Sequence, residues 1–294
     1  MARGARLAGH PDVADELVLG STITQTFVAY RDLYDELGEQ GNDRLALDDQ
    51  EAQILIDLLI EVIDAQLSEQ ADPQILAVLE QARSRAKPRG QEQGAGNILR
   101  HAVNGASTLM SIPPLRRSGQ WLSGRLLLAD LAQVARYLAR GEPDAAGATL
   151  DHRIRSRVFD ALDDRPTVVI AHSLGTVVAL EALHQRLRSV PLWVTLGSPI
   201  GLRTVVWPKL RPQPPSTPEG VDAWLNFWDR DDIVVARAHL ETDVLPNSTG
   251  VRPSSRRVDS DGLWVHTATK YLAQAAVAGP VAAALDQMPR GHAT

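Results

Sequence analysis

Apolar residues recur at helical spacing through much of residues 47–140. The first predicted helix, over residues 48–67, has a broad apolar side and an acidic side opposite it. A second helix is predicted to begin at Pro73, because proline at the first helical position loses no hydrogen bond there. Two more helices are predicted over residues 97–110 and 121–140. This part of the chain is therefore expected to be helical throughout.

The pattern changes after about residue 149, where short apolar runs alternate with helical segments. The run at residues 167–171 is wholly apolar, as expected of a strand that is buried on both faces. The elements predicted after it are a helix over 174–187, strands over 192–196, 223–228 and 256–259, and helices over 267–278 and 281–288. This alternation indicates βαβ units, a mostly parallel sheet and the α/β class. A further strand is predicted near residues 22–30, before the helical segment.

Composition narrows the possible functions. The chain has 294 residues, a net charge of −6 and no cysteine. A disulfide framework, a thiolate metal site and a cysteine nucleophile are therefore excluded. A mildly acidic chain also lacks the basic footprint of a nucleic-acid binder. We expect no transmembrane segment, because the apolar runs are too short, and a cytoplasmic location, because no apolar stretch follows the basic start.

The segment Ala171-His172-Ser173-Leu174-Gly175 joins the first buried strand to the next helix. It is the only Gly/Ala-x-Ser-x-Gly sequence in the chain, and this strand–turn–helix context is that of a nucleophile elbow. Small residues at 171 and 175 are expected because larger ones would meet neighbouring backbone. The N–H of Leu174 would donate to an oxyanion. A tight turn with a purely structural serine is the alternative.

A serine nucleophile needs a histidine base and an acid that orients it, and on this type of sheet they follow in the order serine, acid, histidine. The histidines after Ser173 are His184, His239, His266 and His292. We favour His266, which lies between a predicted strand and a helix. His184 is expected on the exposed side of a helix, His239 lies too close to the acid candidates, and His292 is almost terminal.

Three aspartates follow the strand predicted at residues 223–228, namely Asp229, Asp231 and Asp232. Composition does not choose among them, and an acidic loop is often merely solvated. We favour Asp232 as the acid because it directly precedes an apolar turn, with Asp229 as the alternative.

Taken together, four ordered motifs resemble those of α/β-hydrolase-fold serine hydrolases, in particular the bacterial lipase and GPI-inositol-deacylase-like group. The motifs are Ala171-His172-Ser173-Leu174-Gly175, Leu196-Gly197-Ser198-Pro199-Ile200-Gly201, Trp224-x-Asn226-x-x-Asp229-Arg230-x-Asp232-x-Val234 and His266-x-Ala268-x-x-Tyr271-Leu272. The resemblance covers residues 150–294. It implies the same nucleophile, acid and base, namely Ser173, Asp232 and His266.

The resemblance also implies ester or amide hydrolysis through an acyl-enzyme, with no cofactor and no metal, and we expect a small-molecule ester or lipid-like substrate. The whole chain, 1–294, would then be a single α/β-hydrolase-like domain. Residues 47–140 would be a helical insertion, either a lid or cap that shapes the substrate site or plain helical packing. Fainter matches lie at residues 28–34 and 131–138.

The chain departs from this family in one respect. Such hydrolases usually have an early strand that ends in His-Gly, and the loop after it supplies a second oxyanion donor. No His-Gly occurs in this sequence, and Gly9-His10 has the reverse order. The N-terminal strands are thus expected to be reduced. A catalytically impaired scaffold that acts as a binding protein, and an acyltransferase, are the alternatives to a serine ester hydrolase.

Overall fold

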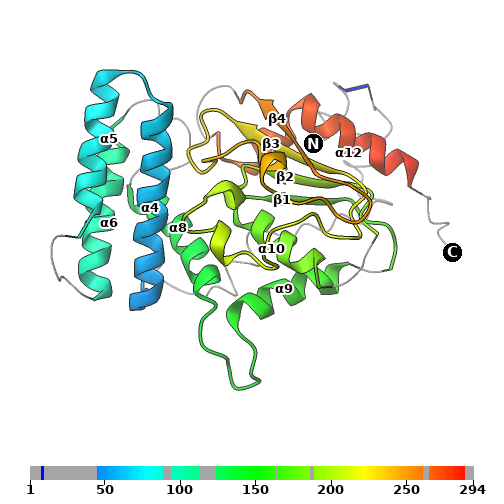
Figure 1. Ribbon diagram of the computed structural model, residues 1–294, viewed down its shortest axis with the longest axis horizontal. Helices are drawn as coiled ribbons and strands as arrows, with labels where there is room; N and C mark the ends of the chain where they lie inside the picture. The colour runs from blue at the N-terminus through cyan, green and yellow to red at the C-terminus, as the bar shows by residue number, and fades with distance from the viewer. Residues whose placement is uncertain are drawn as a thin grey trace.

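The computed structural model describes residues 8–9, 45–88, 94–112, 124–162, 164–185, 189–260 and 265–288. Within these residues four parallel strands form one sheet in the order β1-β2-β3-β4. The strands are β1 (Val169–His172), β2 (Trp193–Leu196), β3 (Trp224–Asp229) and β4 (Pro253–Val258). The described part of the protein is therefore of the α/β class, as predicted (Figure 1).

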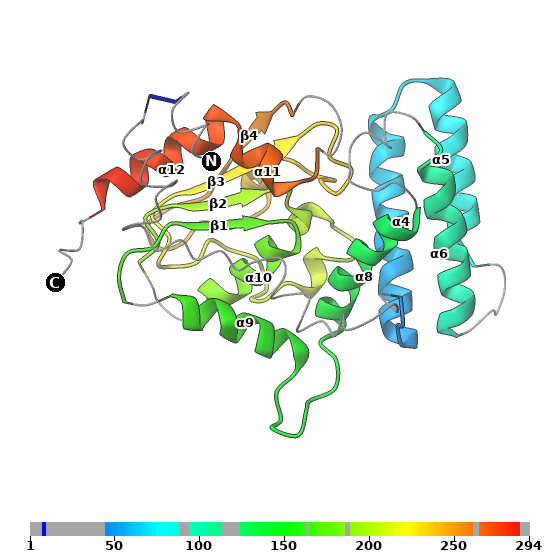
Figure 2. The same cartoon turned by 180° about the vertical axis from the view of Figure 1, so that it is seen from behind.

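Helices cover both faces of the sheet (Figures 1 and 2). On one face lie α9 (Leu150–Ala161) and α10 (Leu174–Leu183), and on the other lie α11 (Ala268–Leu272) and α12 (Ala275–Gln287). Alternate residues of β2 point to the two sides, so Trp193 joins the core beneath α10 while Val194 joins the core beneath α12. Burial of the sheet on both faces explains why β2 is almost continuously apolar, whereas β4, at the edge of the described sheet, carries polar and exposed residues.

Residues 47–140 supply a group of packed helices, which we call the helical unit. Its members are α4 (Asp49–Glu69), α5 (Pro73–Ala86), α6 (Ala95–Leu109) and α8 (Gly124–Ala139). Helix α4 begins with a capping box, in which Asp48 accepts from the Glu51 N–H and Glu51 accepts from the Asp48 N–H. At Gly105 in α6 an added Cβ would lie 2.6 Å from the Cβ of Ala86, so glycine allows α5 and α6 to approach closely.

The helical unit lies at the edge of the sheet where the strands end (Figures 1 and 2). The loop after β2 contacts it directly. The side chain of Glu61 in α4 accepts hydrogen bonds from the backbone N–H groups of Thr204, at 2.8 Å, and Val205, at 3.0 Å. Glu61, on the acidic side of the first predicted helix, therefore binds another segment of the chain. None of the described helices is long and apolar enough to span a membrane.

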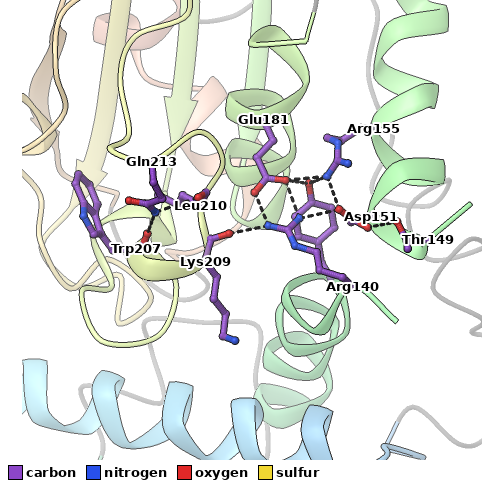
Figure 3. A network of polar contacts seen from close by, with 10 residues as sticks. Arg140, Thr149, Asp151, Arg155, Glu181, Trp207, Lys209, Leu210 and Gln213 are labelled. Atoms are coloured by element: carbon purple, nitrogen blue, oxygen red, sulfur yellow. Dashed lines mark hydrogen bonds and ion pairs between the residues drawn. The ribbon is translucent and has the colours of Figure 1, made fainter. Parts of the chain in front are cut away.

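A buried ionic cluster joins the helical unit to the sheet-covering helices (Figure 3). The side chain of Glu181 in α10 is completely buried and accepts hydrogen bonds from three groups. These are the guanidinium of Arg140, at 2.6 and 2.8 Å, that of Arg155, at 2.9 Å, and the hydroxyl of Tyr137, at 2.7 Å. Asp151 pairs with both arginines. The cluster therefore ties α8 and α9 to α10, the helix that begins directly after Ser173.

The structure differs from the predicted elements in several places. The strand predicted over 256–259 is β4, which spans 253–258, and the helix predicted over 174–187 is α10, which ends at Leu183. Helix α9 was not predicted, although Ile154 and Val158 are buried one turn apart, because charged residues dominate its sequence. The last two helices were predicted to divide near Pro280, but that proline lies inside α12 and the break comes earlier, at residues 273–274. Val277 and Val281, on either side of Pro280, both pack in the core, and this burial offsets the lost backbone hydrogen bond. The strand predicted at 22–30 and the match at 28–34 lie outside the described residues.

Candidate active site

Ser173 occupies the sharp turn between β1 and α10. Its backbone dihedrals are φ 51° and ψ −129°, a conformation that a residue with a side chain rarely adopts. Such a backbone costs about 1–3 kcal/mol and persists only where the surroundings hold it. Here its N–H donates to the Leu196 carbonyl, and Thr176 donates to the Ser173 carbonyl through both its N–H and its hydroxyl. The serine side chain remains partly exposed.

Helix α10 begins at Leu174, immediately after this turn. The first N–H groups of a helix have no acceptor within the helix, and they lie at the positive end of its dipole. The N–H of Leu174 is one of these groups and is the next amide after the serine. An anion formed beside Ser173 would therefore meet a donor and a favourable field.

His266 and Asp232 lie next to Ser173, although the three residues are far apart in the chain. The Nε2 atom of His266 is 3.0 Å from the Ser173 Oγ, and its Nδ1 atom is 2.8 and 2.9 Å from the two carboxylate oxygens of Asp232. Asp232 and His266 are almost fully buried, at 1% and 7% exposure. With the Nδ1 proton directed at the carboxylate, the lone pair of Nε2 faces Ser173 Oγ and can accept the serine proton.

The charges of this pair stabilise one another. Burial opposes a charge on His266, but the attraction and hydrogen bond of Asp232 outweigh it and raise the pKa of His266 above its usual value. Burial likewise opposes ionisation of Asp232, yet the charge and hydrogen bond of His266, together with the Tyr271 hydroxyl, keep the pKa of that carboxyl low. Asp232 is thus held ionised beside an imidazole that readily accepts a proton.

Asp229, the alternative acid, has a different set of contacts. Its carboxylate accepts hydrogen bonds from the backbone N–H groups of Asp231, at 3.0 Å, and Ser260. Burial raises its pKa. The structure therefore brings Asp232 to the histidine, while Asp229 ties the turn after β3 to the end of β4.

The other candidate histidines lie elsewhere. The Nε2 of His184 is 2.9 Å from the Ser216 carbonyl oxygen, in contrast to the exposed helix position expected for it. His239 is exposed and contacts Glu241, at 3.1 Å. His292 lies outside the described residues.

Two further residues contact the candidate triad and were quoted in the sequence motifs without a role. The Tyr271 hydroxyl donates to Asp232 Oδ2, at 2.7 Å, and accepts from the Asp229 N–H, at 3.1 Å. The Nε2 of His172 is 2.6 Å from the carbonyl oxygen of His266. Sequence patterns held no signal for these contacts beyond the position of each residue beside a candidate catalytic one.

Two glycines near the site behave differently from each other. At Gly197, which has φ 53°, an added Cβ would lie 2.7 Å from Asp232 Oδ2 and 3.2 Å from His266 Nδ1. At Gly175 an added Cβ would meet nothing within 4 Å among the described residues beyond its own helix backbone, and the clash expected of a bulkier side chain there stays a prediction. Glycine is needed at position 197, directly after β2, because the backbone there passes beneath the Asp232–His266 pair.

Among the described residues, no group of three or more metal-ligating side chains is arranged to hold a metal ion. No protein-family model, curated protein or solved structure matches this chain.

Proposed function

We propose that the protein is a serine hydrolase that cleaves carboxylic esters through an acyl-enzyme on Ser173, on an α/β-hydrolase-like fold. The observation that carries this proposal is the unbroken series of contacts from Ser173 Oγ to His266 and from His266 to Asp232. The positive φ of Ser173 supports it, because backbone strain of this kind concentrates at functional sites. The resemblance of the four motifs supports ester or lipid-like substrates.

The geometry supports a two-step reaction. His266 Nε2 removes the hydroxyl proton as Ser173 Oγ attacks the ester carbon, and the Leu174 N–H receives the negative oxygen. The intermediate expels the alcohol, which takes the proton from His266, and leaves an acyl-serine. A water molecule then attacks the acyl carbon and gives a proton to His266. As the second intermediate breaks down and the acid leaves, His266 returns this proton to Ser173 Oγ, which restores the serine hydroxyl and the neutral imidazole. Asp232 orients the imidazole and stabilises its positive charge throughout.

Labelling with a fluorophosphonate probe tests this proposal. We expect the folded protein to be labelled on Ser173, and the Ser173→Ala variant to lose both the label and the turnover of p-nitrophenyl esters. Ser68→Ala is a matched control, because Ser68 is exposed on α4 in the helical unit. This variant should be labelled like the wild type.

Three outcomes of this experiment distinguish the candidates. Label on Ser173 with release of free acid supports a hydrolase. Label on Ser173 with acyl transfer to an added alcohol, and little free acid, supports an acyltransferase instead. A folded protein that neither takes the label nor cleaves esters of any chain length overturns the proposal in favour of a binding scaffold.

Replacing Gly197 by alanine should disturb the same site while Ser173, Asp232 and His266 all remain in the sequence. The new methyl group would force Asp232 or His266 to move, and displacements of about 1 Å in a catalytic site cost on the order of 100-fold in rate. We expect kcat for p-nitrophenyl esters to fall by about that factor. Enzyme kinetics with the purified variant measure it.

The control for this variant is Gly250→Ala. Gly250 also has a positive φ, of 85°, but an added Cβ there meets nothing within 4 Å among the described residues. Both substitutions place alanine at a positive φ and should therefore destabilise the backbone. Only Gly197→Ala also crowds Asp232 and His266, so only that variant should lose kcat. Equal kcat values for the two variants would show that Gly197 is not needed to place Asp232 and His266.

A further inference from the structure

His172 is the last residue of β1 and directly precedes Ser173, and its side chain reaches the loop that holds His266. Its Nε2 is 2.6 Å from the His266 carbonyl oxygen, across 94 residues of sequence. A carbonyl oxygen only accepts hydrogen bonds, so Nε2 must carry the proton and donate it. The residue before the candidate nucleophile therefore holds the backbone of the candidate base.

The rings of the two histidines also pack against each other. Their centroids are 4.7 Å apart, with an angle of 43° between the ring planes, and the Tyr271 ring lies 6.3 Å from that of His172. His266 is thus held at its backbone and on its ring by His172, and at Nδ1 by Asp232. These contacts limit both translation and rotation of the imidazole.

The charge state of His172 suits this position. Burial of its ring, followed by the charge of His266, lowers the pKa of His172 to about 3. Among the residues that the structure describes, the titratable groups near the two rings include Asp232, Tyr271 and, from α8, Asp130. A neutral His172 places no positive charge beside His266 when that residue becomes protonated during the reaction.

We propose that His172 is a positioning residue for the hydrolysis proposed above, which holds His266 in line between Ser173 and Asp232 through its Nε2–H and its ring. This inference rests on the proposed function. It assigns to His172 a role in setting the geometry of the base and no contact with the substrate. A misplaced imidazole would lower kcat, while substrate binding would change little.

Two substitutions of His172 distinguish its hydrogen bond to the His266 carbonyl from the packing of its ring. His172→Gln keeps an N–H donor at similar reach, whereas His172→Phe keeps a ring and removes the donor. We expect His172→Phe to lose about 10- to 100-fold in kcat with KM nearly unchanged, since misplacement of catalytic groups costs rates of this order. His172→Gln should recover most of this loss. His152→Gln, on the exposed side of α9, is the matched control and should behave as the wild type.

The pH profile supplies a readout that a merely structural role would not change. Asp232 raises the pKa of His266, so a loosened His266 should titrate closer to its usual value. The acid limb of kcat/KM should therefore move to lower pH in His172→Phe, and stay in place in His172→Gln. Unchanged kcat and an unchanged acid limb in a folded His172→Phe variant would overturn the inference, as would equal losses in both variants.

Failure of the proposed function would be recognised separately, because the wild-type protein would then neither be labelled nor turn over esters. In that case NMR titration of the His266 ring still tests the positioning role. The pKa of His266 should be lower in His172→Phe than in the wild type and in His172→Gln. The same pKa in all three proteins would refute it.

Discussion

Replacing Asp232 by asparagine should lower kcat for ester cleavage by about 10⁴-fold while leaving the fold intact, as the loss of a triad carboxylate does in serine proteases. The carboxylate accepts a hydrogen bond from the Nδ1–H of His266, which keeps the proton on Nδ1 and leaves Nε2 without one. An asparagine amide can instead donate to Nδ1, so the proton would sit on Nε2. In that tautomer His266 could not take the proton of Ser173.

Steady-state kinetics on p-nitrophenyl esters measure this loss, and circular dichroism checks the fold. Asp231→Asn is the matched control, because Asp231 lies in the same turn and is exposed. It should retain the wild-type kcat. Asp229→Asn reports on the alternative acid, and we expect it to affect mainly stability, because the Asp229 carboxylate accepts two backbone N–H groups. A larger loss of kcat in Asp229→Asn than in Asp232→Asn would reverse the assignment of the acid.

Replacing Glu181 by alanine should have the largest effect on stability. The change leaves Arg140 and Arg155 with only Asp151 as an acidic partner in the cluster, in a region where Glu181 and Asp151 are almost completely buried. Removing one member of a buried ion pair typically costs about 3–5 kcal/mol, because the remaining charge stays buried without compensation. Urea-induced unfolding measures the difference in the free energy of unfolding.

Glu80→Ala is the control for this comparison. Glu80 is exposed on α5, and surface substitutions of this kind change stability by less than about 0.5 kcal/mol. If Glu181→Ala does not fold, the milder Glu181→Gln, which keeps the shape and one acceptor, provides the measurement. A free energy of unfolding equal to that of the wild type in Glu181→Gln and Glu181→Ala would show that the cluster contributes nothing to stability.

The same cluster links stability to the candidate site. Glu181 lies on α10, whose first residue follows Ser173, and Arg140 follows α8 of the helical unit. Arg140 also donates to the carbonyl oxygen of Lys209, in the segment between β2 and β3. The position of α10, and with it the turn that holds Ser173, is therefore fixed by three parts of the chain that are distant in sequence.

Much of the fold was predictable from local patterns. The capping residues Asp48 and Asp72 and the apolar stripe of α4 identify the helices, because these signals come from neighbours in the chain. The short apolar runs identify the strands for the same reason. The helix α9 and the continuation of α12 through Pro280 were not predicted, because burial of α9 in the core shared with α8 and α10, and of α12 against the sheet, outweighed their unfavourable local sequences.

The sequence by itself determined the position of the serine turn, the order of the strands along the chain, and the short set of residues from which an acid and a base had to come. Only the tertiary structure decided that Asp232 and not Asp229 meets His266, that His172 and Tyr271 hold that pair, and that Gly197 leaves room for it. The physical reason is that turns and strands depend on residues close together in the chain. These contacts instead join the ends of β1, β2 and β3 to His266, just before α11, and a parallel sheet brings such segments together at one edge only when it folds.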